Sequence, residues 1–505
     1  MKPSPAVALT LLLCTSVTAG EPIEVGSRLE LMIDDHLIDT MSDSLRLQMH
    51  KPVRRNVALI TDKPWEGNAC SYSSVFQDGD RHRMYFGAYQ YEHADGKLLY
   101  PHKQFTCYAE SQDGIHWTKP KLGLVEFNGS DQNNIVLQHG SVPGIPIDPG
   151  HIAVFKDSNP ACPADARYKA IVRSTQAKGL YALKSRDGFR FTPVTRELVI
   201  TDGYFDSQNL AFWDSVRGEY RAYFRDFHDG IPGKDGIRGI KTATSKDFVQ
   251  WTTPKWLIFP GAPDEQLYTN QITPYDRAPH IFIGFPMRYV DRGRVDSTGK
   301  LPHPEFRRQR AAIHPRYGSA VTDGLMMTSR DGLTFKRWGE AIIRPGPSRT
   351  NSWVYGDNII SWGILPTKSD LPRAPDELSI YAIEGYWTGK SQNFRRYSMR
   401  VDGFVSVRAP LGGGEFVTKP IVFEGEKLVI NYSTSAAGGI HVEIQDADGQ
   451  PLKGYTQSDC HEIFGDEIQR EVEWQSTGKV AELSSRPVRL RFILKDADLF
   501  SFRFR

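Results

Sequence analysis

The chain has 505 residues, of which 39% are hydrophobic and 11% aromatic. This composition is typical of a folded protein of two or three domains and excludes a disordered chain. Its 62 lysine and arginine residues against 60 acidic residues give a net charge of +2, so we expect neither a nucleic acid nor an anionic membrane as a partner.

Residues 1–20 have the pattern of a secretory signal peptide. An apolar run over residues 6–14 follows Lys2, and small residues precede Gly20. The run is too short to span a membrane, and no later segment is apolar enough to anchor the chain. We therefore expect a secreted or periplasmic protein.

Four cysteines remain after the predicted cleavage: Cys70, Cys107, Cys162 and Cys460. No pair has the spacing of metal ligands. A Cys70–Cys107 disulfide and two buried free thiols are both compatible with the sequence. We expect no metal site and no cofactor, and leave open a structural calcium ion in a central channel.

Residues 21–56 predict a separate N-terminal strand segment, and short strand pairs begin after it. Each pair consists of two apolar runs separated by Asp, Gly, Asn or Pro, which is typical of antiparallel strands. The pairs cover residues 72–76 and 81–85, 151–155 and 168–172, 209–213 and 220–224, 271–275 and 281–283, and 358–362 and 378–381. No sustained helical period occurs between them, which argues against a parallel α/β fold.

One motif recurs along these pairs: a serine, an aspartate two residues later, and an aromatic residue four residues after the aspartate. Its five copies, the last with asparagine for aspartate, are Ser111, Asp113 and Trp117; Ser185, Asp187 and Phe191; Ser245, Asp247 and Trp251; Ser329, Asp331 and Phe335; and Ser391, Asn393 and Tyr397. Self-similarity of strand-built units indicates the blades of a propeller, and we expect the five copies at equivalent corners of successive blades. The sequence predicts an all-β fold, with a five-bladed β-propeller over residues 57–402.

Residues 403–505 differ from the repeats in the composition of their turns. Alternating strands are expected over residues 427–432, 440–444, 488–494 and 499–504. About 100 residues of this kind predict a C-terminal β-sandwich, for which a structural role is favoured over carbohydrate binding.

The innermost strand of each blade lines the channel of a propeller, so a ligand site is expected at one mouth. Acids or amides stand at the start of all five predicted inner strands: Glu66 and Asn68; Asp148 and His151; Asp206, Gln208 and Asn209; Asp264, Glu265 and Asn270; and Asp357 and Asn358. A merely hydrated channel is the alternative. A second set follows the returning strands: Arg225, Asp226, Arg288 and Glu384. These side chains could bind hydroxyls, a carboxylate or a sulfate, or pair with each other between blades.

The chain resembles the five-bladed propeller glycoside hydrolases of the invertase, levansucrase and arabinofuranosidase/xylosidase types. The resemblance covers residues 50–505. It rests on the five repeats, on Phe76-Gln77-Asp78-Gly79 followed by Met84-Tyr85-Phe86, on Ala211-Phe212-Trp213 at the head of a hairpin, and on the trailing sandwich. It implies that one acid on each of three inner strands carries out the chemistry.

Carried over to this sequence, the resemblance implies catalytic roles for three acids. Asp206 falls near the stabilising aspartate, Glu265 near the general acid, and Glu66 is the nearest candidate for the nucleophile or base; Asp357 is the reserve candidate. The neighbouring charge of Asp264 predicts a raised pKa for Glu265. The expected substrate-binding residues are Asn68, His151, Gln208, Asn209, Arg225, Asp226, Asn270, Arg288, Asn358 and Glu384.

These features predict a secreted glycoside hydrolase that cleaves terminal sugars from a polysaccharide or oligosaccharide. A non-catalytic carbohydrate-binding or scaffold propeller is the alternative, and it would lack a close pair of acids at the mouth. A phosphorolytic enzyme is a third possibility, with Arg225 and Arg288 as the candidates for binding phosphate.

Overall fold

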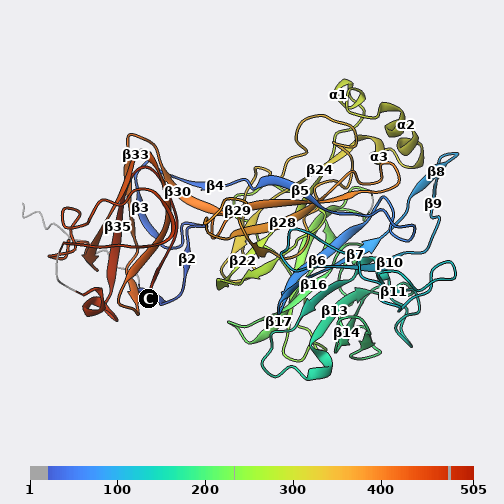
Figure 1. Cartoon of the computed structure of the whole chain (residues 1–505), viewed down its shortest axis with the longest axis horizontal. Helices are drawn as coiled ribbons and strands as arrows, with labels where there is room; N and C mark the ends of the chain where they lie inside the picture. The colour runs from blue at the N-terminus through green and yellow to red at the C-terminus, as the bar shows by residue number, and fades with distance from the viewer. Residues whose placement is uncertain (1–20, 233, 476–478) are drawn as a thin grey trace, which may run out of the picture. The chain divides into compact units, whose positions relative to one another are not determined.

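The computed structural model describes residues 21–232, 234–475 and 479–505, so the predicted signal peptide lies outside the described residues. The described chain consists mainly of β-strands, with three short α-helices within residues 296–319 (Figure 1). This confirms the predicted all-β class. By contact the chain divides into two compact units: residues 49–405, and residues 406–505 together with the described residues up to 48.

The larger unit contains five four-stranded antiparallel sheets, called here the first to the fifth sheet (Figure 1). Their strands, from first to fourth, are β6 (Ser71–Asp78), β7 (Arg81–Ala88), β10 (Phe105–Ser111) and β11 (Ile135–Gln138); β12 (Ala153–Lys156), β13 (Tyr168–Arg173), β14 (Leu180–Ser185) and β15 (Thr192–Pro193); β16 (Leu210–Asp214), β17 (Glu219–His228), β18 (Ile237–Ser245) and β19 (Lys255–Trp256); β21 (Thr273–Tyr275), β22 (Ala278–Gly284), β25 (Met327–Ser329) and β26 (Lys336–Arg337); and β27 (Leu365–Thr367), β28 (Glu377–Glu384), β29 (Asn393–Arg400) and β5 (Val53–Ile60). A hairpin of β8 (Glu92–Ala94) and β9 (Lys97–Leu99) lies between β7 and β10.

The second strands of these sheets are apolar in continuous runs because both of their faces are covered. In β7, Met84, Tyr85 and Phe86 are consecutive and have no exposed surface. In β22, the residues 281–283 are equally buried. A sheet that packs on both faces loses the simple alternation of apolar and polar residues.

The fifth sheet takes its fourth strand from the N-terminal side of the chain. Strand β5 pairs with β29 from Ile60 opposite Asn393 to Val53 opposite Ser398. The first sheet is joined to the segment that precedes β27, because Val75 N donates to Trp362 O at 2.7 Å. All five sheets contribute to the lining of one cavity of about 470 Å³. The lining residues lie toward the carboxyl-terminal ends of the first strands or in the chain next to these strands.

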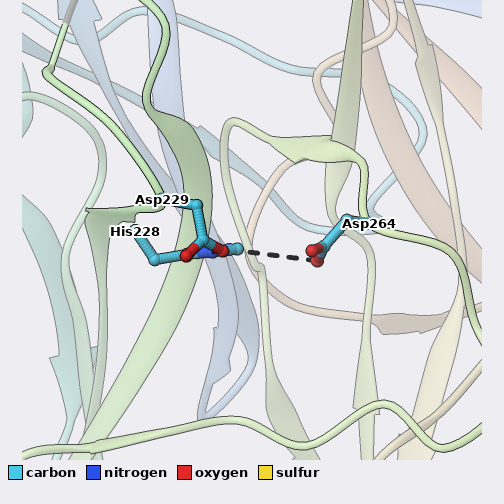
Figure 2. Close-up of side chains that lie close together, drawn as sticks. All are labelled: His228, Asp229 and Asp264. Atoms are coloured by element: carbon cyan, nitrogen blue, oxygen red, sulfur yellow. Dashed lines mark hydrogen bonds and ion pairs between the residues drawn. The ribbon is translucent and has the colours of Figure 1, made fainter.

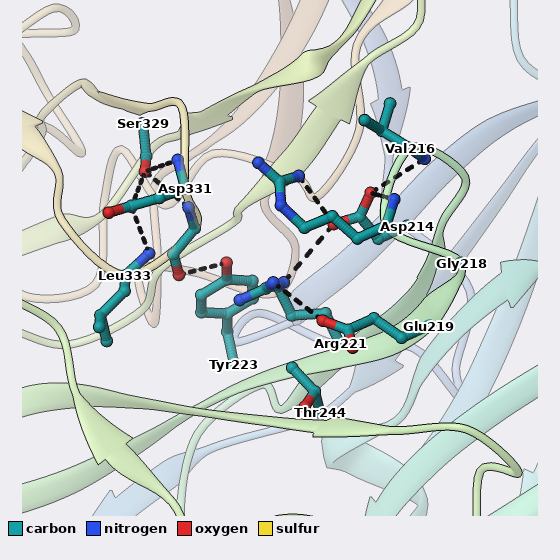
Figure 3. Close-up of polar contacts among 12 residues, drawn as sticks. Asp214, Val216, Gly218, Glu219, Arg221, Tyr223, Thr244, Ser329, Asp331 and Leu333 are labelled. Carbon is teal, nitrogen blue, oxygen red and sulfur yellow. Dashed lines mark hydrogen bonds and ion pairs between the residues drawn. The ribbon is translucent and has the colours of Figure 1, made fainter.

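Four copies of the recurring motif form the same corner, between the third and fourth strands of a sheet. Figure 3 shows the corner of the fourth sheet, with Ser329, Asp331 and Leu333. In the fourth sheet, Ser329 Oγ accepts a hydrogen bond from Gly332 N at 2.8 Å, and Asp331 Oδ1 accepts from Leu333 N at 2.8 Å and Thr334 N at 2.7 Å. Partial burial opposes ionisation of Asp331, but these hydrogen bonds lower its pKa. The same contacts recur at Ser111 and Asp113, Ser185 and Asp187, and Ser245 and Asp247.

A corner packs against the second strand of the preceding sheet. Tyr223 OH donates to Gly332 O at 2.8 Å (Figure 3). Gly332 has φ +76°, and a Cβ there would lie 2.8 Å from Tyr223 OH and 2.9 Å from Arg221 Nη1. Tyr381 of the fifth sheet donates to Gly114 O of the first-sheet corner in the same way. Glycine suits this position because of the positive φ and the close approach, although Phe248 occupies it in the third-sheet corner with φ +67°.

The fifth copy of the motif is not a corner. Asn393 and Tyr397 lie within β29, where they pair with β28 and β5. The chain makes no turn from a third to a fourth strand in the fifth sheet, because the fourth strand is β5. The prediction of five equivalent corners was therefore wrong for this copy.

The fourth sheet carries an insertion that the sequence did not predict. Strands β20 (Gln266–Leu267), β23 (Met287–Asp291) and β24 (Ala320–Gly324) form a further antiparallel sheet. Helices α1 (Asp296–Gly299), α2 (Pro304–Ile313) and α3 (Arg316–Ser319) connect β23 to β24 (Figure 1). Proline in the first turn and an acid beside it are typical of a helix start, but ten residues are too few for a clear period.

The smaller unit is built on two long strands, β33 (Leu428–Asp446) and β35 (Val488–Phe504), with a register shift between Thr434 and Gly439. They belong to a ten-stranded sheet, whose other members are β1 (Ile23–Gly26), β2 (Glu30–Leu31), β3 (Ile38–Met41), β4 (Arg46–Met49), β30 (Val405–Ala409), β31 (Gly414–Thr418), β32 (Ile421–Phe423) and β34 (Asp466–Glu471). The residues expected to form a separate N-terminal segment thus supply β1 to β4 to this sheet and the start of β5 to the larger unit.

The cysteines of the described chain, Cys70, Cys107, Cys162 and Cys460, are free thiols. Among the described residues, no helix has both the length and the apolar character needed to cross a bilayer.

Candidate functional site

Asp206 lies in the segment that leads into β16, and half of its side chain is exposed. Three groups from two other strands and a 3₁₀ turn surround its carboxylate. Arg173 Nη1 of β13 is 2.5 Å from Oδ1, Arg225 Nη2 of β17 is 3.5 Å from Oδ2, and His151 Nε2 is 3.6 Å from Oδ1. The surrounding protein opposes the charge, but His151, Arg225 and Arg173 lower the pKa of Asp206. Asp206 is therefore an accessible, ionised carboxylate at neutral pH.

His151 is held between Asp206 and a second aspartate. It ends the 3₁₀ turn Pro149–His151, whose N-cap is Asp148. Asp148 Oδ2 lies 2.9 Å from His151 Nδ1, and the imidazole packs on the Tyr72 ring at a centroid distance of 4.8 Å. Burial disfavours the charge of Asp148, but His151 and Arg173 lower its pKa to about 2. A permanently ionised Asp148 at Nδ1 leaves Nε2 as the nitrogen that faces Asp206.

Three tyrosines and three arginines from different elements interleave beside Asp206. Tyr268 and Tyr355 precede the first strands of the fourth and fifth sheets, and their hydroxyls are 3.0 Å apart. The guanidinium carbons of Arg225 and Arg238 lie 4.9 and 5.2 Å from the centroid of the Tyr268 ring. The remaining pair, Tyr289 and Arg316, comes from the insertion of the fourth sheet. We call these six residues, Arg225, Arg238, Arg316, Tyr268, Tyr289 and Tyr355, the Arg–Tyr cluster.

The predicted amides are buried and bonded to the backbone. Gln208 Nε2 donates to Tyr72 O at 3.0 Å, and Asn358 Nδ2 donates to Thr322 O at 3.0 Å. The other three amides have the same kind of contact: Asn68 with Tyr91 O and Gly389 O, Asn209 with Phe205 O and Ser207 O, and Asn270 with Tyr223 O. These contacts favour a structural role in fixing the starts of the first strands.

Two of the predicted catalytic glutamates are held in ion pairs. Glu66 has no exposed surface, and Lys119 Nζ lies 2.6 Å from Glu66 Oε2. Burial nevertheless raises the pKa of Glu66. Glu265 lies between Arg288 and Arg337. Burial opposes its charge, but hydrogen bonds from these two arginines lower its pKa. The expectation of a raised pKa for Glu265 was therefore wrong, because the two cations outweigh any effect of Asp264.

The remaining members of the second predicted set are also paired. Glu384 accepts from Arg54 at 3.0 Å and from Arg395 at 3.0 Å. Asp226 lies 2.8 Å from Lys241 Nζ. Arg288, besides binding Glu265, forms a two-point pair with Asp323 at 3.0 and 2.7 Å. These contacts match the alternative of structural ion pairs.

Asp357 differs from the other predicted catalytic acids because, among the described residues, no cation forms an ion pair with it. It precedes the first strand of the fifth sheet, is almost fully buried, and accepts a hydrogen bond from Tyr386 N at 2.8 Å. Burial raises its pKa to about 7 against the effect of that hydrogen bond. Asp357 thus holds the Tyr386 backbone, and the Tyr386 ring lies 6.0 Å from that of Tyr355.

A separate group of ionisable residues lies at the end of β17 (Figure 2). His228 Nδ1 is 2.6 Å from Asp229 Oδ2, and its Nε2 is 4.0 Å from Asp264 Oδ1. Their possible ligand atoms lie within 4.8 Å of one another. Three donors, two of them on exposed residues, are fewer than structural zinc or calcium sites use, so we assign no metal to this group.

The structure therefore brings together Asp206, His151 and Arg225 from the predicted set. It adds Arg173, Tyr72, Tyr268 and the two arginines Arg238 and Arg316. Arg173 and Arg238 stand at the mouth-side ends of strands, which the strand pattern could have indicated. Arg316 could not be found in this way, because it lies in the unpredicted insertion.

Neither a comparison with protein-family models nor one with curated protein sequences gives a match. Among solved structures, a protein described as a glycoside hydrolase aligns at 11% identity and a TM-score of 0.41, over 70% of this chain and 93% of its own. An N-acetylgalactosamine deacetylase from F. plautii, in complex with blood group B trisaccharide, aligns at 12% and 0.40, over 70% and 94%. An endo-arabinase from Bacteroides thetaiotaomicron aligns at 11% and 0.40, over 69% and 98%. At these TM-scores the likeness supports no activity, and the proposal below rests on this chain's own side chains.

Proposed function

We propose that the five sheets are the blades of a five-bladed β-propeller followed by a β-sandwich, and that the chain is a secreted glycoside hydrolase. Three contacts support closure of the propeller: β5 completes the fifth sheet, Trp362 bonds to the first strand of the first sheet, and the first-sheet corner packs on Tyr381 of the fifth. The amino ends of the first strands then surround one mouth, which holds Asp206.

The observation that carries the proposal is the half-exposed, ionised carboxylate of Asp206 beside an oriented histidine and a group of tyrosine rings. Hydrolysis of a glycosidic bond passes through a transition state with positive charge on the sugar ring. Asp206 stabilises that charge. Protonated His151, with Nδ1 toward Asp148, donates the Nε2 proton to the leaving-group oxygen as the glycosidic bond breaks. Water forms the new bond to the anomeric carbon and returns a proton to Nε2. The buried rings of Tyr72 and Tyr268 pack on His151 and on Arg225 and Arg238, and so hold these groups in place beside Asp206.

A second candidate function is carbohydrate binding without hydrolysis. Glu66, Glu265 and Glu384 are all neutralised by cations, so in the described chain no second free carboxylate is recorded in contact with Asp206. Two facing carboxyl groups are the usual requirement of a glycosidase. A mouth of aromatic side chains around one acid fits the non-catalytic alternative, unless His151 supplies the proton.

The test is turnover by the purified full chain on a panel of plant and algal oligosaccharides, measured as released sugar. We expect Asp206→Asn and His151→Gln each to lower kcat by at least about a hundredfold, the scale of a lost acid–base or charge-stabilising group. Asp202→Asn is the matched control: it removes the same charge from the same segment, and its carboxylate contacts Lys241 instead. Equal turnover of Asp206→Asn and the control would refute the assignment. Binding of an oligosaccharide without any release would establish the second candidate.

A further inference from the structure

The Arg–Tyr cluster carries more positive charge than its contacts neutralise. Arg225 contacts one acid, Asp206, through Nη2 alone. Arg238 Nη1 donates to Gln266 Oε1 at 2.8 Å, which brings no negative charge. For Arg316, in the described chain, no ion pair with an acid is recorded. Of the three guanidinium groups only Arg225 thus contacts an acid in the described chain, and that acid, Asp206, is also paired with Arg173.

The aromatic rings hold these cations close together. Phe227 and Arg238 are direct partners across β17 and β18, and Arg225 lies two residues before Phe227 on the same face. Arg238 and Arg316 lie 5.1 and 5.8 Å from the centroid of the Tyr289 ring. Burial lowers the pKa of Arg238, and the charges of Arg225 and Arg316 lower it further. Like charges at this spacing cost free energy unless an anion joins them.

Buried hydrogen-bond donors of the cluster lack partners. Arg225 is 3% exposed and Arg238 is 7% exposed. In the described chain, Arg225 Nη1 and Nε, Arg238 Nε and Arg316 Nε are buried without a hydrogen-bond acceptor. An unsatisfied buried donor is costly, and a guanidinium group matches the geometry of a carboxylate, sulfate or phosphate.

A pocket of about 500 Å³ lies against the cluster, lined by Arg238, Arg316 and Tyr289 among others. The charged groups that also face it are Lys234, Arg288, Glu265, Asp291 and His314. Glu265 is already paired with Arg288 and Arg337, and Asp291 accepts a hydrogen bond from Ser319 Oγ at 2.6 Å. The four cations that line the pocket, Lys234, Arg238, Arg288 and Arg316, outnumber its two acids, so the pocket keeps room and net positive charge for an anionic ligand.

We infer that Arg238 and Arg316 bind an oxyanion group in this pocket, so that the substrate is an anionic glycan, with a sulfate ester or uronic carboxylate next to the sugar held at Asp206. Arg225 does not line the pocket; it lies between Asp206 and Tyr268, whose ring also packs on Arg238. That the ligand is a sugar rests on the proposed function. That the pocket binds an anion does not. Free phosphate is also an oxyanion and could bind the same guanidinium groups. In that case the glycosidic bond would be cleaved by phosphate instead of water.

The test measures binding by titration calorimetry in low salt, using the full chain and four probes: glucuronic acid, galactose 6-sulfate, galactose and inorganic phosphate. We expect the charged sugars to bind at least about tenfold more tightly than galactose, the scale of one or two charge-assisted hydrogen bonds. Arg238→Met and Arg316→Met should each abolish this preference, and Arg238→Lys should retain part of it. Arg292→Met, at an exposed arginine just after β23, should leave it unchanged. Thermal melting of each variant shows which ones remain folded, and Arg316 is only partly buried, so its variant keeps the test informative.

Equal affinity for galactose and the charged sugars, or an unchanged preference in a folded Arg316→Met variant, would overturn the inference. Tight phosphate binding, with phosphate-dependent turnover of a neutral glycoside, would assign the oxyanion site to free phosphate. Preference for charged sugars in Asp206→Asn, with no turnover by the parent on any substrate, would uphold the oxyanion site and refute the hydrolase. Turnover of neutral glycans, with no preference for charged sugars in binding, would uphold the hydrolase and refute the oxyanion site.

Discussion

At the scale of single residues, the chemistry of this chain depends on which acids have been neutralised. Spacing along the sequence identified polar side chains at the starts of strands, and three of them, Asp206, His151 and Arg225, do meet. Spacing could not show that the side chains of Gln208, Asn209 and the other amides donate their hydrogen bonds to backbone carbonyls. It could not show either that Lys119, from the connection between β10 and β11, and Arg337 of β26 form ion pairs with Glu66 and Glu265, because those pairs exist only in the folded chain.

Asp357 gives a prediction on pH. Its folded pKa of about 7 lies above the ordinary value of 3.8, because burial disfavours its charge. Between roughly pH 4 and 7 the folded state therefore binds more protons than the unfolded state, and the free energy of unfolding falls as the pH rises. Asp357→Asn keeps the acceptor for Tyr386 N and has no proton to lose. We expect the parent to lose roughly 1–4 kcal/mol more than this variant between pH 5 and pH 8. The measurement is urea unfolding at both pH values; parallel losses in the two proteins would contradict the assignment.

At the scale of elements, the Ser-x-Asp corner is the best example of structure that the sequence specifies locally. Its contacts lie within six residues, so four copies were recognised without knowledge of the rest of the fold. The fifth copy failed because the same letters can occur inside a strand, where pairing with β28 and β5 determines the conformation. Helix α2 was missed for the opposite reason: ten residues carry too little periodicity.

The corner gives a stability prediction. Asp331→Ala removes the acceptor for two backbone N–H groups, and should lower the free energy of unfolding by roughly 0.5–2 kcal/mol. Gly332→Ala should cost more, because φ is +76° and the added Cβ would meet Tyr223 OH. Asn393→Ala, at the copy that is not a corner, should stay within about 0.5 kcal/mol. Chemical unfolding compares the three variants, and turnover per folded molecule should be unchanged. Equal effects at Asp331 and Asn393 would show that the corner contacts contribute nothing.

At the scale of the whole molecule, the division of the chain is not sequential, and this limited what could be predicted. The all-β class and the approximate order of the hairpins follow from local strand patterns. The roles of the first 60 residues do not, because β1 to β3 pair with strands near the C-terminus and β5 pairs with β29, more than 300 residues away. Local sequence carries no record of such pairings.

The two ends of the first strands offer two different places for a ligand. The amino ends carry Asp206, His151 and the Arg–Tyr cluster. The carboxyl ends line the cavity of about 470 Å³, where Phe155, Trp213 and Trp362 contribute aromatic surface. If the proposal is right, a sugar belongs at the amino ends, because an ionised acid and an oriented histidine lie side by side there.

The most direct test of this claim is a crystal structure of Asp206→Asn with an oligosaccharide that the parent cleaves. We predict that the scissile bond lies within hydrogen-bonding distance of the side chain at position 206 and of His151 Nε2. A sugar found instead in the cavity at the carboxyl ends of the first strands, with the mouth at Asp206 free of ligand, would contradict the account.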